Sequence, residues 1–148
     1  MAVEIVLVTD DTEWQTSFSR VIKEYPDLHE KSIYSSYDNV DIKEISHIHC
    51  AVVDIDLATS CKQSYEAIRS FVFSYNPKRP VIIAIGTQDQ RYINEDSDRY
   101  GIDFYSKKYP VEESVKMALE TIEVFKEPGG NSRLLVSDMK AGNSTMCI

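Results

Sequence analysis

Short apolar segments alternate with longer amphipathic segments along the chain. Continuous runs rich in β-branched residues predict strands that are buried on both faces, as in a parallel sheet covered by helices. The clearest are 3–8, 46–53 and 80–85. Weaker strand patterns occupy 31–37 and 102–105.

Between these runs, apolar residues recur at spacings of three and four, which predicts amphipathic helices. The three strongest helical patterns run over 14–25, 68–75 and 111–125. Two polar segments, about 40–45 and 88–99, predict further helices on weaker patterns. Asp11 or Thr12 can cap the first helix, and Pro110 suits the first turn of the last one.

The order of these segments is strand then helix, five times over. Such alternation with short links predicts an α/β fold with a five-stranded parallel sheet, doubly wound as (βα)5. We expect one domain over 1–126. Residues 127–148 contain Pro128-Gly129-Gly130 and one apolar island, Leu134-Leu135-Val136, and we expect them to form a flexible or loosely docked tail.

Composition places the chain among soluble globular proteins. Its 148 residues are 43% hydrophobic and 27% charged, and no segment is apolar enough to cross a bilayer. The formal net charge of -8 argues against binding to nucleic acid or to an anionic membrane surface. The start of the chain does not resemble a signal peptide, and three cysteines without metal-ligand spacing fit a reducing cytoplasm.

Candidate chemistry gathers where the predicted strands end. In a doubly wound sheet, ligands bind beyond the carboxyl ends of the strands. The sequence delivers Asp10-Asp11, Asp54-Ile55-Asp56, Thr87 and Lys108 to that edge. Carboxylates about 4 Å apart repel by roughly 4 kcal/mol per pair, so they stay ionised together only beside a cation. Oxygen ligands favour Mg²⁺.

This ordered set resembles the receiver domain of two-component response regulators, over about residues 3–126. The matching pieces are Leu7-Val8-Thr9-Asp10-Asp11, Ala51-Val52-Val53-Asp54-Ile55-Asp56-Leu57 and Gly101-Ile102-Asp103-Phe104-Tyr105-Ser106-Lys107-Lys108. The resemblance implies a flavodoxin-like receiver fold.

The resemblance also implies roles for individual residues. Asp54 would be the phosphoacceptor. Asp10, Asp54 and the backbone carbonyl of Asp56 would bind Mg²⁺, with Asp11 reaching back as a further acid. Lys108 and Thr87 would contact the phosphoryl group, and Tyr105 would be the aromatic switch residue.

Four positions depart from the family pattern, one of which is Leu57-Ala58 in place of the usual Met-Pro after the phosphoacceptor strand. Thr9 stands where the first acid of the usual pair is expected. Strict register puts Ile85 or Gly86, rather than Thr87, at the usual hydroxyl position. The usual Lys-Pro pair is replaced by Lys108-Tyr109. These changes weaken the expectation of efficient phosphotransfer.

Three functions follow from these patterns. The first is a stand-alone switch, not an enzyme, phosphorylated on Asp54 by a histidine kinase or phosphotransfer protein and acting on an unknown downstream protein. The second is a degenerate receiver that serves as a phosphorylation-independent interaction module. The third is a phosphatase of the haloacid-dehalogenase type, although no acidic pair at a later strand end supports it. A homodimer is left open.

Overall fold

The structure is a computed structural model. It describes residues 2–57, 66–67, 70, 76, 78–88 and 102–125. The predicted helices over 68–75 and 88–99, and the predicted tail over 127–148, lie outside the described residues apart from Ser70 and Gln88.

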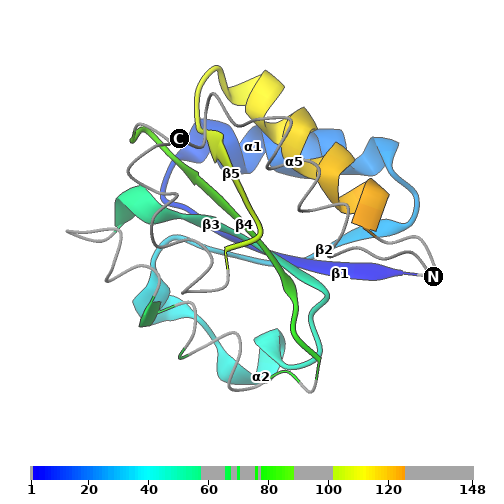
Figure 1. The fold of residues 1–148 in the computed structure, drawn as a ribbon, viewed down its shortest axis with the longest axis vertical. Helices are drawn as coiled ribbons and strands as arrows, with labels where there is room; N and C mark the ends of the chain where they lie inside the picture. Colours follow the sequence, from blue (N-terminus) through cyan, green and yellow to red (C-terminus); the bar gives the residue numbers. More distant parts are fainter. Residues whose placement is uncertain are drawn as a thin grey trace.

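The described strands form one parallel sheet, which confirms the predicted architecture (Figure 1). The strand order is β2-β1-β3-β4-β5. The strands are β1 (Val3–Val8), β2 (Leu28–Tyr34), β3 (Cys50–Asp54), β4 (Val81–Gly86) and β5 (Phe104–Lys107). The central strands β1, β3 and β4 are almost completely buried, as their apolar composition requires.

Helices cover both faces of the sheet. Helices α1 (Thr12–Val21) and α5 (Val111–Phe125) lie side by side on one face, and the short α2 (Ile42–Ile45) lies on the other (Figure 1). The described residues also form three short 3-10 helices, η1 (Ile22–Glu24), η2 (Tyr37–Asn39) and η3 (Ile55–Leu57). No described helix is long and apolar enough to span a membrane.

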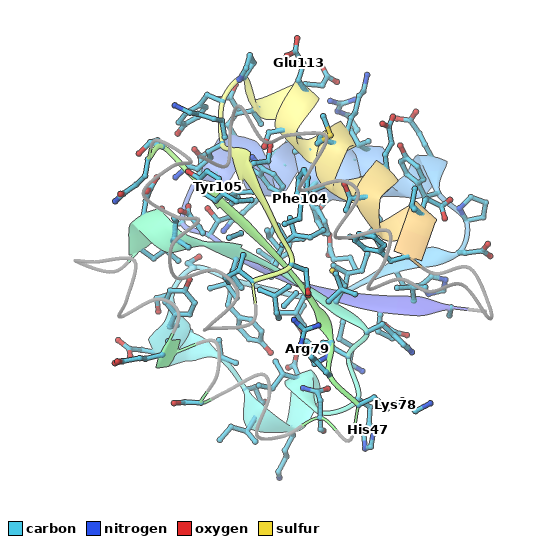
Figure 2. The ribbon with its side chains drawn as sticks, in the orientation of Figure 1. His47, Lys78, Arg79, Phe104, Tyr105 and Glu113 are labelled. Atoms are coloured by element: carbon cyan, nitrogen blue, oxygen red, sulfur yellow. The ribbon has the colours of Figure 1, made fainter. Side chains whose placement is uncertain are left out.

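Alternate residues of each strand point to opposite faces and build two cores. Ile5 and Leu7 of β1 pack with Trp14 and Phe18 of α1. Their neighbours on β1, Val6 and Val8, belong to the second core, which includes Ile45 of α2. The same alternation divides β5, where Phe104 and Tyr105 enter different cores (Figure 2).

The boundaries of four strands differ from the prediction, although β4 is shifted by only one residue, to Val81–Gly86. β2 begins at Leu28 rather than at residue 31, because the Val3 to Leu28 pairing with β1 sets its register. β3 begins at Cys50 rather than at 46, since His47 has a positive φ of 71° that does not fit a strand. β5 is shifted by two residues from the predicted 102–105 and runs over Phe104–Lys107.

Candidate functional site

Asp54 is the last residue of β3, and its side chain is fully buried (0% exposed). Three donors hold its carboxylate. The hydroxyl of Thr9 donates to Oδ2 at 2.6 Å, and the ammonium of Lys108 donates to the same oxygen at 2.8 Å. The backbone N–H of Asp56 donates to Oδ1 at 2.9 Å. Both carboxylate oxygens are therefore engaged inside the protein.

Lys108 reaches Asp54 because the chain after β5 is fixed by two backbone contacts. The Lys108 N–H donates to the carbonyl of Gly86 at 2.9 Å, and the Lys108 carbonyl accepts from Nε1 of Trp14 at 3.2 Å. The Lys108 side chain is only 8% exposed, and its Nζ also lies 3.6 Å from Oδ2 of Asp56. Lys108 thus sits between the two acids that follow β3.

Opposing effects set the pKa of Lys108. Burial by itself lowers the pKa of the ammonium, but the hydrogen bond to Asp54 and the charges of Asp54 and Asp56 raise it. The net result is a pKa above the usual value of 10.5. Lys108 is therefore a permanent cation at neutral pH, and it supplies the positive charge that Asp54 needs in the interior.

Thr9 follows β1, and sequence reasoning treated it only as a missing acid. Its side chain is 0% exposed. The hydroxyl donates to Asp54 and accepts from the N–H of Asp11 at 3.2 Å, so its hydrogen bonds are satisfied. The available signal was its register position, one residue before Asp10 at the end of a buried strand.

The acidic pair after β1 has other surroundings than Asp54. Asp11 caps α1, where its Oδ1 accepts from the N–H of Trp14 at 3.0 Å. Its Oδ2 accepts from the hydroxyl of Tyr109, which is half exposed. Burial raises the pKa of Asp11. The hydrogen bonds from Tyr109 and Trp14 and the charge of Lys108 together outweigh this effect, so the pKa lies below its usual value of 3.8. Asp10 is exposed.

A hydrogen bond connects Asp56 with the residue that follows β4. The backbone N–H of Thr87 donates to Oδ2 of Asp56 at 3.0 Å, while the Thr87 residue itself is exposed. Gly86 is buried, and a side chain there would approach Cγ1 of Ile55 to 2.7 Å. Close packing against Ile55 therefore disfavours a side chain at Gly86, one of the two positions to which strict register assigns the hydroxyl.

Tyr105 is buried (4% exposed), and its hydroxyl donates to the carbonyl of Gln88 at 2.8 Å. Tyr37 also reaches the site, since its hydroxyl donates to the backbone carbonyl of Asp54 at 2.9 Å. Sequence analysis had no signal for Tyr37, because it lies in a 3-10 turn without a periodic pattern.

Solved structures with a similar fold include response-regulator receiver domains. The response regulator domain of Thermotoga maritima CheB superposes with a TM-score of 0.66 at 12% identity, over 84% of this chain and 96% of that chain. The isolated REC domain of RcsB from Salmonella enterica serovar Typhimurium, in the presence of phosphomimetic BeF3-, gives a TM-score of 0.66 at 10% identity, over 92% and 99%.

A third similar chain comes from the complex of the CheA3 P1 domain with CheY6 from R. sphaeroides. It superposes with a TM-score of 0.63 at 12% identity, over 82% of this chain and 95% of that chain. No protein-family model matches the sequence, and no curated protein is significantly similar to it. The chain has the receiver fold.

In this receiver fold, the structure brings together only part of the predicted site. Asp54, Asp56 and Lys108 meet at the carboxyl edge of the sheet. Among the described residues, neither Asp10 nor Asp11 contacts Asp54 through its side chain, and no group of three or more acids, histidines or cysteines is close enough to hold a metal ion. Mg²⁺ binding remains a prediction.

The donor set around Asp54 fits an ammonium better than a divalent cation. Mg²⁺ requires near-octahedral oxygen ligation, usually with carboxylates and water. Here, Lys108 Nζ lies 2.8 Å from Oδ2 of Asp54 and 3.6 Å from Oδ2 of Asp56, so both acids already have a cation beside them. As they are arranged, these residues do not fit Mg²⁺.

Proposed function

We propose that this chain is a receiver-fold signalling domain that acts through protein contacts and keeps Asp54 as an internal structural acid rather than as a phosphoacceptor. The single observation that supports this proposal is the contact of both Thr9 and Lys108 with Oδ2 of a fully buried Asp54. This corresponds to a degenerate receiver, an interaction module whose output does not need phosphate.

The physical argument concerns access and charge. A nucleophilic carboxylate needs an oxygen that can approach phosphorus, together with space for three phosphoryl oxygens. In this chain, Oδ2 of Asp54 is enclosed by a hydroxyl and an ammonium, and Oδ1 accepts a backbone N–H. Phosphorylation would require both side chains to leave their present hydrogen bonds with Oδ2.

A phosphoacceptor switch is the second candidate function. The contact between Asp54 and Lys108 favours it, because an ammonium beside the acceptor could pair with a phosphoryl oxygen. The donor would be a histidine kinase or phosphotransfer protein, in line with the CheA3 P1–CheY6 complex among the similar structures. Thr9 and Lys108 would have to release Oδ2 first.

Intact-mass measurement after incubation with Mg²⁺ and acetyl phosphate separates the two functions. We expect no phosphoryl adduct on the protein without substitutions, and none on Asp54→Asn. A phosphoryl adduct that appears on the unmodified protein and is lost in Asp54→Asn would overturn the proposal and establish the switch.

Thr9→Asp is the matched gain-of-function variant. A carboxylate at this position would face Asp54 and repel it by roughly 4 kcal/mol at close range, and a divalent cation would relieve the repulsion. We expect Mg²⁺ to raise the melting temperature of Thr9→Asp and to leave that of the unmodified protein unchanged. Equal stabilisation of both proteins by Mg²⁺ would contradict the role assigned to Thr9.

A further inference from the structure

A cavity of about 220 Å³ lies at the amino edge of the sheet, opposite the Asp54 network. The first residues of β1, β3 and β4 form its floor, and the last turn of α5 forms one wall. Figure 2 shows Lys78 and Arg79 at this end, well separated from Tyr105 and Glu113. Its lining includes Val3, Ile48, His49, Cys50, Lys78, Arg79, Pro80, Val81, Ile122 and Phe125.

The polar groups of the cavity wall favour an anionic ligand. Lys78 is exposed beside the cavity, and Arg79 pairs with the buried Asp103 at 2.7 Å while keeping 40% of its side chain exposed. His49 accepts the N–H of Glu4 at Nδ1 with a distance of 2.9 Å, so a neutral ring carries its proton on Nε2. An ammonium, a guanidinium and an imidazole N–H therefore border one cavity in a chain of net charge -8.

The rest of the lining is apolar, and the volume limits the ligand. Val81, Ile122 and Phe125 offer aliphatic and aromatic surface. A dry cavity of about 150 Å³ is large enough for benzene in another protein. This cavity, at about 220 Å³, can therefore hold one ring with a carboxylate but not a nucleotide or a larger cofactor.

We propose that this cavity binds a small monocarboxylic acid with one apolar ring, of about the size of benzoate. The ring lies against Ile122 and Phe125, and the carboxylate faces Lys78 and the Nε2–H of His49. This site is independent of Asp54 and of the function proposed above. The bound acid would contact both the amino ends of the strands and the last turn of α5.

Titration of the full chain with benzoate, followed by amide chemical shifts, tests the proposal. We expect saturable shifts at Val3, Cys50 and Val81, with a Kd on the order of 1 mM for a ligand of this size. Benzamide has the same shape without the charge, and we expect it to bind about twofold to fivefold more weakly, as loss of an exposed ion pair implies.

Two lysine variants identify the group that recognises the carboxylate. Lys78→Gln should weaken benzoate binding by about twofold to fivefold and leave benzamide binding unchanged. Lys31→Gln removes a similarly exposed lysine from the β2 edge strand and should change neither affinity.

Val81→Phe should fill the cavity and abolish binding of both compounds. If that variant does not fold, the comparison of Lys78→Gln with Lys31→Gln still tests the proposal.

Three results would overturn the proposal. The first is the absence of saturable shifts around the cavity. The second is equal affinity for benzoate and benzamide together with no effect of Lys78→Gln. The third is displacement of the same amide signals by Leu135→Asp alone, which would show that the segment after residue 125 occupies the cavity.

Discussion

The two ends of the sheet differ in the surroundings of their lysines, Lys108 at the carboxyl edge and Lys78 at the amino edge. At the carboxyl edge, Lys108 is buried and donates to Asp54, so its charge is neutralised within the protein. At the amino edge, Lys78 is exposed beside a cavity lined mostly by apolar residues. The difference arises from the chain path: the backbone after β5 is tied to Gly86 and Trp14, which directs Lys108 inward.

This comparison shows that position at a strand end does not by itself make a reactive site. The carboxyl edge carries the acids and the lysine that typify receiver domains, but their contacts satisfy one another. At the amino edge, the side chains of Lys78 and Arg79 border the cavity. Burial and pairing therefore decide which charged groups are available to a ligand.

The largest expected effect comes from Lys108→Met. Removal of this ammonium leaves the buried Asp54 carboxylate without its cation, and we expect a loss of about 3–5 kcal/mol in the free energy of unfolding. Lys107→Met is the matched control, because the adjacent Lys107 is exposed and should change stability by less than about 0.5 kcal/mol. Urea unfolding of both variants measures the difference. Equal losses would contradict the assigned pairing.

The pH dependence of stability should carry the same signature. The folded pKa of Lys108 lies above its usual value of 10.5, so its contribution is fully present below pH 10.5 and is lost as the pH rises through the folded pKa. The stability gap between the unmodified protein and Lys108→Met should therefore be constant near neutral pH and shrink above 10.5. If the stability difference between the two proteins stayed constant up to the highest pH at which both fold, Lys108 would not be the group responsible.

Thr9→Val gives a smaller expected loss. The substitution keeps the shape of the buried side chain but removes the hydroxyl that donates to Asp54, so we expect a loss of about 1–2 kcal/mol. Thr87→Val is the control at an exposed strand-end threonine and should be nearly neutral. A neutral Thr9→Val would mean that the hydroxyl does not support Asp54.

The smallest effect concerns the acids after β1. Asp11→Ala removes the cap of α1 and should cost about 1 kcal/mol, whereas Asp10→Ala should be nearly neutral because Asp10 is exposed. Thermal unfolding of the pair measures this contrast. If the two variants were equally stable, Asp11 would be free for a role at the carboxyl edge and the capping assignment would fail.

The sequence by itself determined the parallel α/β sheet and the residue types at its edges. Continuous apolar runs such as Val3–Val8 encode strands, and the three-and-four spacing over 111–125 encodes a helix, because these periodicities are local. Asp54 and Lys108 could be placed at one edge from the same pattern, since carboxyl ends of parallel strands meet.

Only the tertiary structure decided which groups pair at that edge. Thr9 and Lys108 lie 45 and 54 residues from Asp54, and sheet register with the tether to Trp14 brings their donors to one oxygen. The sequence also suggested that Asp11 reaches back to this edge, but its carboxylate accepts from Trp14 and Tyr109 instead. Such choices depend on distances of an ångström or less, which no local pattern encodes.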